Sequence, residues 1–194
     1  MDNRELQNRN EESAPEDEQE LRFEFGCPLE EVAQLASDVR MGETARRKRD
    51  RLNPEQAAKR LQMYLSKPNA IELVLRKGEE LIGCAFSYEQ FAEELEKEIP
   101  VPGVNLFSRE GERVFALREL DVKFSQRGYG FGQLIMERIM QEAQQKGATK
   151  LLISVFPDKD NIGFQMYKKL GFEAVAPKQN TNYYYMSYDC PLKK

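Results

Sequence analysis

Three glycines alternate with other residues in one short stretch of the chain, and this spacing is suited to binding a phosphate group. Gly128, Gly130 and Gly132 follow Arg127, and a residue without a Cβ atom lets a ligand come close to the backbone. Bulky apolar residues precede the run, and apolar residues three and four apart follow it, which predicts a strand, a turn and a helix. At the start of such a helix, backbone N–H groups and the helix dipole both favour an anion.

The glycine run is neither of the two common nucleotide-binding loops. The chain contains no Gly-x-x-x-x-Gly-Lys-Ser/Thr string, which a P-loop requires. A dinucleotide-binding Gly-x-Gly-x-x-Gly string that starts at Gly128 would need a glycine where Gln133 stands. By itself the run is also compatible with a tight surface turn, so its meaning depends on the residues around it.

A longer string, from Val122 to Gly132, gives the glycine run a more specific meaning. It resembles the acyl-CoA-binding motif of the GNAT family of N-acetyltransferases, Val-x-x-x-x-Arg-Gly-x-Gly-x-Gly/Ala. A second string of that family, Asn-x-x-Ala-x-x-x-Tyr-x-x-x-Gly-Phe, is matched in most positions from Asp160 to Phe172. The resemblance is clear over about residues 71–189.

Two positions depart from the pattern of that family. Phe124 stands where the family frequently has Pro. Asp160 stands where the family usually has Asn, and this chain has Asn161 one place later. The second departure leaves open whether the contact made by the family's Asn is made in this chain.

The resemblance implies both a fold and a reaction. The fold would be of the α+β class, a mixed, mostly antiparallel sheet with helices on both faces. The reaction would be direct transfer of an acetyl or other acyl group from acyl-CoA to an amine, with acetyl-CoA as the expected donor. Backbone N–H groups from Arg127 to Gly132 would hold the pyrophosphate, and main-chain groups of Val122 would face the acyl arm. The positions expected to contact the donor are Leu120, Val122, Arg127, Gly128, Tyr129, Gly130, Phe131, Gly132, Asp160 and Asn161.

Acyl transfer to an amine also needs groups that move protons. By resemblance, Tyr167 matches the tyrosine that donates a proton to the CoA sulfur; the alternative is a core aromatic residue on an amphipathic helix. For the base, Glu119 and Asp121 are the carboxylates on the strand that leads to the glycine run. They are two residues apart, so they share one face of the strand unless a bulge intervenes. The alternative for this pair is a solvated strand face.

The composition narrows the classes of function. The chain has 194 residues and a net charge of −4, whereas a general nucleic-acid binder usually carries a basic excess. It contains no His, which excludes a Ser-His-Asp triad and argues against a zinc site, so we expect no metal. Three scattered cysteines, Cys27, Cys84 and Cys190, are typical of reduced thiols in a cytoplasmic protein. Because no apolar run could span a membrane and no signal peptide opens the chain, we expect no membrane partner.

The chain is expected to form one domain with a tail at each end. Residues 1–20 hold eight acids and two arginines, and we expect them to be disordered because they cannot bury enough apolar area. Residues 21–190 would form the acyltransferase domain and residues 191–194 a C-terminal tail. Within the domain, residues 89–103 are interpreted as an insertion, either a lid over the acceptor pocket or a longer turn.

Several functional questions stay open at this stage. By resemblance to the family, the basic run at residues 46–51 would border the acceptor site, where it could meet an anionic acceptor or the CoA phosphates; the alternative is a solvated loop. A catalytically silent acyl-CoA-binding regulatory module is an alternative to an enzyme. A protein-interaction module that binds no CoA is a second alternative. The acceptor would be the amine of a small molecule or a protein, and a homodimer is compatible with the sequence.

Overall fold

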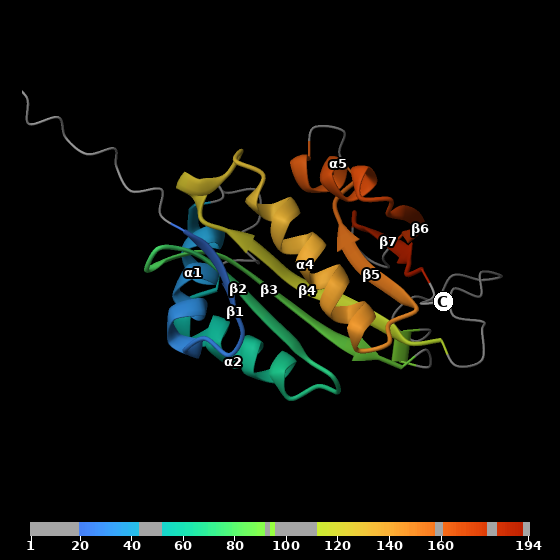
Figure 1. Cartoon of the computed structure of the whole chain (residues 1–194), viewed down its shortest axis with the longest axis horizontal. Helices are drawn as coiled ribbons and strands as arrows, with labels where there is room; N and C mark the ends of the chain where they lie inside the picture. Colours follow the sequence, from blue (N-terminus) through green and yellow to red (C-terminus); the bar gives the residue numbers. More distant parts are fainter. Residues whose placement is uncertain are drawn as a thin grey trace, which may run out of the picture.

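The computed structural model of the chain describes residues 20–42, 52–91, 94–95, 112–157, 161–177 and 182–191. Within these ranges, seven strands form one sheet in the order β1-β2-β3-β4-β5-β7-β6 (Figure 1). The elements in chain order are β1 Leu21–Glu24, α1 Leu29–Gly42, α2 Pro54–Leu65, β2 Ile71–Lys77, β3 Glu80–Gln90, β4 Val114–Val122, the 3-10 turn η2 Phe124–Gln126, α4 Phe131–Gln145, β5 Lys150–Val155, α5 Ile162–Lys169, β6 Glu173–Pro177 and β7 Tyr184–Asp189.

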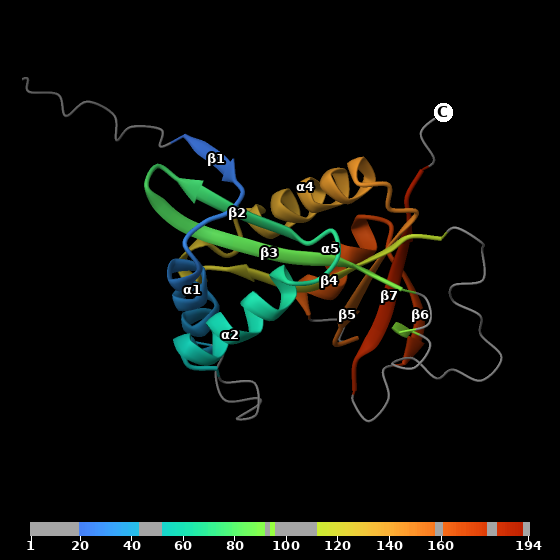
Figure 2. The same cartoon turned by 90° about the horizontal axis from the view of Figure 1, so that it is seen from below.

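The sheet is mixed because one of its strand pairs is parallel. β4 and β5 run parallel, and every other neighbouring pair is antiparallel. A parallel pair needs a crossover connection, and α4 provides it. The helices α1 and α2 cover one face of the sheet and α4 covers the other (Figure 2). The predicted α+β fold is therefore confirmed.

Each face of the sheet has its own hydrophobic core. Side chains of α1 and α2, including Val32 and Leu61, pack on Val74 and Phe86 of the sheet. On the opposite face, α4 and α5 pack on residues of β2, β3, β4, β5 and β7, with Ile135 of α4 fully buried. These two cores hold the helices that border the central strand β4.

A glycine in β3 lets α4 lie close to the sheet. A Cβ atom at Gly83 would come within 2.6 Å of Ile135 Cδ1 and 3.1 Å of the backbone oxygen of Asp121. Gly83 pairs with Val122 at the end of β4. The absence of a side chain therefore brings the first half of α4 against the end of the strand from which the glycine run continues.

A buried arginine ties β1 and α1 to the second strand. Arg76 Nε donates to Glu24 at 2.9 Å, and its two terminal nitrogens donate to the carboxylate of Glu31 at 2.8 and 2.6 Å. The same guanidinium donates to the Glu79 carbonyl at 2.9 Å and contacts the Cys27 sulfur at 3.2 Å. Hydrogen bonds from Arg76 hold the pKa of both carboxyls below the ordinary value of 4.5. Arg76 therefore connects β2 with β1 and α1 through hydrogen bonds.

Replacing Arg76 by Met should lower stability at neutral pH and weaken its acid dependence. A carboxyl with a lowered folded pKa stabilises the protein above its unfolded pKa, and this contribution is lost as the pH falls through the folded pKa. The melting temperature of Arg76→Met should thus be several degrees below wild type at pH 7, and the difference should shrink below about pH 4.5. Thermal melts from pH 7 to pH 3 measure both effects.

The exposed pair between Lys59 and Glu55, at 2.7 Å, provides the control. Lys59→Met should leave the melting temperature nearly unchanged at every pH, because exposed ion pairs contribute little. A pH-independent difference between Arg76→Met and wild type would show that Arg76 stabilises by packing rather than through its charge.

The segment after β3 differs in one respect from the sequence-based expectation. β3 runs through Gln90, so the first residues of the expected insertion at 89–103 belong to the strand. Leu95 is fully buried in a small cluster with side chains of β4, β5 and β7. At this residue the segment is part of the core.

Several expectations concern residues outside the described ranges. These are the acidic segment up to residue 19, the basic run at residues 46–51, most of the insertion, Asp160, and the last three residues of the chain. For the described ranges, no helix combines the length and apolar character that crossing a membrane requires.

Candidate active site

The central feature of the site is the point where two parallel strands separate. β4 and β5 pair only from Val114 to Ala116, opposite Lys150 to Leu152. Beyond Ala116, β4 continues to Val122 without β5, while β5 continues beside β7 (Figure 1). Among the described residues, the second half of β4 therefore has a strand partner on its β3 side alone. The space between the two separated strands is called the gap.

The glycine run stands at the end of this gap. Gly128 and Gly130 have φ angles of +87° and +84°, a left-handed conformation that side chains with a Cβ rarely adopt. Gly130 is the N-cap of α4 and provides no side-chain hydrogen bond to the helix. A Cβ atom at either glycine would meet nothing within 4 Å. The glycines thus allow the left-handed backbone conformation of this turn. The space around them, next to the N–H groups at the start of α4, is open.

The start of α4 also meets α5 and the end of β4. A Cβ atom at Gly132 would lie 3.6 Å from Met166 Sδ and 3.8 Å from Val122 Cγ2, which are ordinary contacts. Leu120 and Val122 pack against the core on the α4 side of the sheet. The predicted donor-binding positions on β4 and in the glycine run are therefore brought together at one place.

Two side chains of the predicted set have specific partners at the loop. Arg127 Nε donates to the Val122 carbonyl at 3.2 Å, and its guanidinium lies 5.5 Å from the centre of the Phe124 ring. Tyr129 is 74% exposed and stacks on Phe131 at 6.1 Å. A ligand that hydrogen-bonds to the Val122 carbonyl would have to share it with Arg127.

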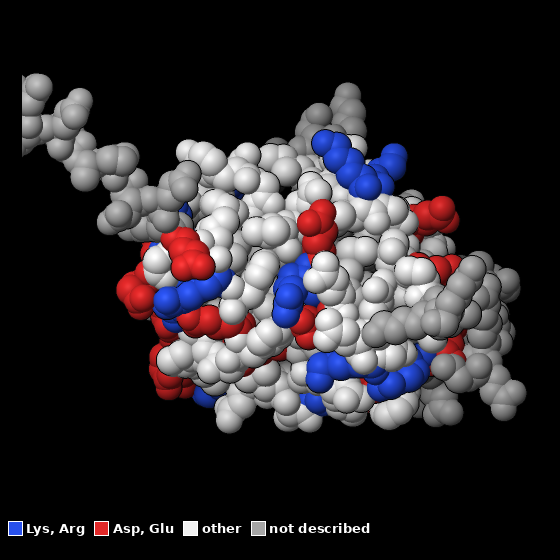
Figure 3. Space-filling view, viewed as in Figure 1, with Lys and Arg blue, Asp and Glu red and all other residues white. Residues whose placement is uncertain are grey.

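Basic side chains gather on α5 beside this loop. Lys168 and Lys169 form the last turn of α5, and Figure 3 shows Lys and Arg side chains over this helix on the viewed face. Positive charge at this position favours an anionic ligand near the glycine run.

The position of Asn161 is explained by helix capping. Its Oδ1 accepts a hydrogen bond from the Phe164 N–H at 3.3 Å, and its Nδ2 donates to the Phe156 carbonyl at 3.1 Å. The side chain thus starts α5 and fixes the exit from β5. A contact between Asn161 and the donor, as predicted, would compete with these two hydrogen bonds. The neighbouring Asp160 is not among the described residues.

The string Tyr-x-x-x-Gly-Phe forms the end of α5. The N–H of Phe172 donates to the Tyr167 carbonyl at 3.0 Å, and the N–H of Gly171 donates to the Lys168 carbonyl at 3.1 Å. Gly171 has a φ of +89°, so these bonds form a Schellman motif. Its usual hydrophobic contact is made by the Tyr167 and Phe172 rings, 5.7 Å apart. The spacing in the string is therefore the geometry of a helix end, and it fixes the Tyr167 ring.

The environment of Tyr167 keeps its hydroxyl protonated. The residue is 8% exposed and belongs to the core on the α4 side. Burial, with a smaller contribution from the charge of Asp121, raises the pKa of Tyr167 well above its usual value. Both effects favour the protonated form of the phenol.

A bulge in β4 precedes the two carboxylates. Phe86 pairs with Glu119 and Ser87 with Leu117, so the register between β3 and β4 skips the position of Arg118. Because the bulge lies before Glu119, Glu119 and Asp121 still share one face, the face covered by α1 and α2. Their exposed fractions are 5% and 8%. The shared face is as predicted, and the alternative of a solvated strand face is wrong.

Helix α2 contributes two partners of Glu119 that sequence reasoning missed. Arg60 forms an ion pair with Glu119 at 2.8 Å, and the Tyr64 hydroxyl lies 3.4 Å from the same carboxylate oxygen. Arg60 Nε donates to the Tyr64 hydroxyl at 2.6 Å. Burial, followed by the charge of Glu119, raises the pKa of Tyr64. The sequence shows only an arginine and a tyrosine four residues apart on a predicted helix. That spacing does not indicate that both contact Glu119.

The site therefore has groups on both faces of β4. The carboxylates lie on the α2 side, and Tyr167 lies on the α5 side. In the described part of the chain, no three acidic or cysteine side chains are grouped as a metal site would require.

Comparisons with known proteins agree with this architecture. A family model described as "Acetyltransferase (GNAT) family" matches residues 34–172. The solved structure of PH1933 from Pyrococcus horikoshii OT3 is 16% identical, with a TM-score of 0.64 over 89% of this chain and 100% of that chain. An N-acetyltransferase from Staphylococcus aureus Mu50 is 13% identical, with a TM-score of 0.64 over 89% and 99%. NAA60 from Arabidopsis thaliana, solved in complex with acetyl-CoA, is 16% identical, with a TM-score of 0.61 over 88% and 98%. None of the curated proteins matches this chain.

Proposed function

The chain belongs to the acetyltransferase (GNAT) family, and from this premise we propose that it transfers an acetyl group from acetyl-CoA directly to an amine. The observation that carries the proposal is the gap between β4 and β5, which ends at a glycine run with two left-handed glycines and an uncapped helix start. The gap would accept the extended arm of the donor, and the helix start its pyrophosphate. Acetyl-CoA in the related NAA60 structure supports this choice of donor.

The proposed reaction moves two protons while the acyl group changes partner. The neutral amine attacks the thioester carbonyl, a C–N bond forms and the C–S bond breaks. A carboxylate on the other face accepts the proton that the ammonium must lose before it attacks, and Tyr167 gives its proton to the departing thiolate. The phenolate of Tyr167 then recovers a proton, directly or through water, from the nitrogen that became positively charged when the C–N bond formed. The amine thus enters from the α2 side of β4.

Direct transfer is supported by the state of the nearby thiol. Cys84 pairs with Asp121 across the sheet and is fully buried. Burial raises the pKa of its thiol well above the ordinary value, and the charge of Asp121 adds to this effect. Because the thiolate is the reactive form, Cys84 is unsuited to carry the acyl group.

Glu119 is the first candidate for the base and Asp121 the second. Glu119 is held by Arg60 and Tyr64, so an incoming ammonium would have to share this carboxylate with Arg60. Asp121 is the carboxylate whose charge reaches Tyr167. An acceptor that binds Glu119 would therefore lie next to Arg60, whereas one that binds Asp121 would lie closer to Tyr167.

Glu119→Gln should lower kcat/KM at pH 7 by about 10²-fold and move the activity to higher pH. Without the base, only amine that is already deprotonated can react, and an alkylammonium has a pKa of about 10. A pH–rate profile of wild type, Glu119→Gln and Asp121→Asn with one working amine measures the effect. Glu55→Gln, on the exposed part of α2, is the control. Superimposed profiles of all four proteins would exclude both carboxylates as the base.

Release of free thiol from acetyl-CoA across classes of amines tests the function itself. Amine-dependent release, with the acetylated amine identified by mass, is the expected result. Binding of acetyl-CoA without release for any amine would favour the silent regulatory module. Absence of acetyl-CoA binding would favour an interaction module.

A further inference from the structure

The edge of the sheet at β2 is only partly covered. β1 has four residues and pairs with Val74 to Lys77. Ile71 to Leu73 therefore pair with β3 on one side, and on the other side no strand among the described residues accompanies them. After β1 the chain turns away through Phe25 and Gly26, where Gly26 has a φ of +72°. An open edge of this kind presents backbone groups that can pair with another chain.

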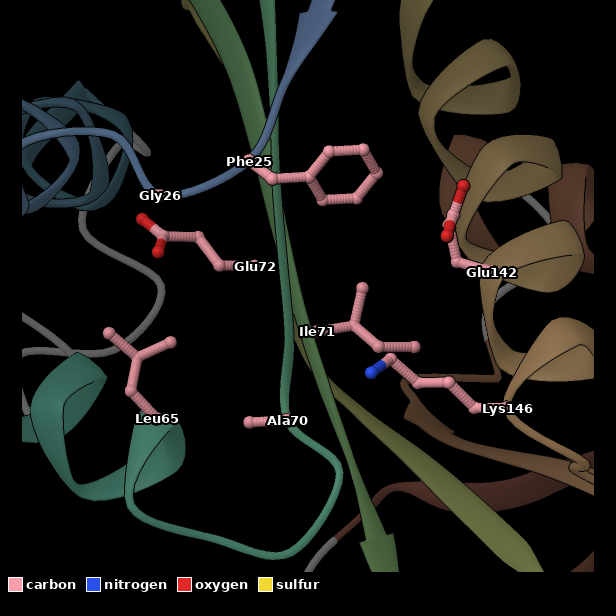
Figure 4. A pocket seen from close by; sticks show the side chains of 8 residues that line it. All are labelled: Phe25, Gly26, Leu65, Ala70, Ile71, Glu72, Glu142 and Lys146. Atoms are coloured by element: carbon pink, nitrogen blue, oxygen red, sulfur yellow. The ribbon is translucent and has the colours of Figure 1, made fainter.

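A pocket of about 410 Å³ lies at this open edge (Figure 4). Ile71 and Glu72 are consecutive in β2, so their side chains point to opposite faces of the sheet. Figure 4 shows Ile71 directed toward α4 and Lys146, and Glu72 directed toward the side of Gly26 and Leu65. The pocket therefore extends around the edge of the strand, with one half on each face.

The two halves of the pocket differ in character. The α4 half is lined by the ring of Phe25, which is 52% exposed, by the edge of Ile71, which is 3% exposed, and by Glu142 and Lys146 at the end of α4. The other half contains Glu72, whose Oε1 is buried and makes no hydrogen bond to any described residue. Burial raises the pKa of Glu72. A buried carboxylate oxygen without a partner is unfavourable, and a cationic group would stabilise it.

We propose that this edge binds an extended segment of a partner protein as an added strand beside Ala70 to Leu73, with a lysine directed at Glu72 and an aliphatic residue on each side of that lysine directed at the Ile71 half. Alternation along a strand sends the lysine to one face and its two neighbours to the other. The lysine would match the Glu72 carboxylate on one face, and the aliphatic residues would match the exposed Phe25 ring on the other. Backbone pairing would provide the register, and the side chains would provide specificity.

A second copy of the chain fits this edge less well. A two-fold pairing of β2 with the β2 of another copy would bring two Glu72 carboxylates close together, and like charges in opposing positions destabilise a strand pair. Binding at this edge is also separate from acyl transfer. β3 lies between β2 and β4, so the edge is roughly 10 Å from the strand that carries Glu119.

Titration of the full-length, ¹⁵N-labelled protein with short peptides tests the proposal. The probe is acetyl-Thr-Val-Lys-Val-Thr-amide, and a second peptide has norleucine in place of lysine. We expect amide shifts centred on Ala70 to Leu73 and a Kd about tenfold lower for the lysine peptide, because a hydrogen bond between charged groups is lost in the other. A third peptide, N-methylated at the lysine and at both valines, should not bind, because none of these residues can then donate a backbone hydrogen bond to the strand in either chain direction.

Two variants test whether the preference for the lysine peptide depends on the charge of Glu72 or on another carboxylate of the pocket. Glu72→Gln should make the Kd values of the lysine and norleucine peptides equal. Glu142→Gln, which also lines the pocket but has Arg138 as its partner at 2.7 Å, should preserve the tenfold difference. Unchanged spectra away from the edge show that each variant is folded.

Four outcomes would overturn the proposal. The first is absence of shifts at Ala70 to Leu73, and the second is equal binding of the N-methylated peptide. Shifts at this edge that depend on protein concentration without peptide would show that a second copy occupies it. Shifts at this edge on deletion of residues 1–19 would show that the chain covers it with its own segment.

Discussion

Gly130→Val should abolish acetyl-CoA binding and leave the domain folded. Gly130 has a φ of +84°, which a β-branched residue avoids. Moving out of this conformation would turn the N–H groups at the start of α4 away from the position of the pyrophosphate. If the conformation were kept, the side chain would fill the open space in front of them. Both routes remove the anion site.

The effect on folding should be small by comparison. A left-handed conformation costs a residue with a Cβ about 1–2 kcal/mol, so the melting temperature should fall by a few degrees only. Calorimetric titration with acetyl-CoA and a thermal melt of the same sample measure both quantities. Acetyl-CoA binding at wild-type affinity by a folded Gly130→Val protein would contradict the assignment of this loop.

Gly132→Ala is the matched control for that experiment. Gly132 lies in the first turn of α4, and a Cβ there would make ordinary contacts with Met166 and Val122. The family motif also accepts Ala at this position. The variant should therefore bind acetyl-CoA nearly as wild type does, and replacing a glycine inside a helix should preserve or raise stability.

Tyr167→Phe should lower kcat by about 10²-fold, which is the low end of what one general acid contributes. The affinity for acetyl-CoA should change little, because the ring would still pack against Phe172. Since the pKa of Tyr167 is raised, its own deprotonation should not produce a loss of activity in wild type at moderately alkaline pH. Steady-state kinetics and calorimetric binding on the same preparations measure the two quantities.

A second buried tyrosine controls for the loss of a hydroxyl group. Tyr185 is 2% exposed and lies in the separate cluster that contains Leu95. Tyr185→Phe should keep the wild-type kcat. If Tyr167→Phe also kept it, the Tyr167 ring would serve packing alone and the proton donor would be elsewhere.

The features that could be predicted from the sequence have local causes. The helix start at Pro54 follows from Asn53 and Gln56, which form a capping box. The turn before α4 follows from the glycine run, because left-handed residues favour glycine. The side-by-side placement of Glu119 and Asp121 follows from the period of a strand. In each case the residues that cause the structure are close together in the chain.

The features that could not be predicted depend on contacts between distant segments. Tyr64 and Glu119 are 55 positions apart, and their contact depends on how α2 lies over β4. The bulge at Arg118 is visible only in the register of β3 and β4. The pocket at Glu72 exists because β1 ends after four residues. The sequence pattern of β2 contains no information about the length of β1.

The separation of β4 and β5 also affects how the molecule unfolds. The two halves of the sheet share only three ladder pairs, so backbone pairing gives them little cooperativity. Their coupling comes instead from α4, whose core joins Leu73 of one half to Leu151 and Met186 of the other. We therefore expect the N-terminal and C-terminal halves to behave as two local folding units connected through a helix. A donor molecule bound between β4 and β5, as proposed, would connect the two halves a second time, so the bound protein should open as one unit where the free protein can open as two.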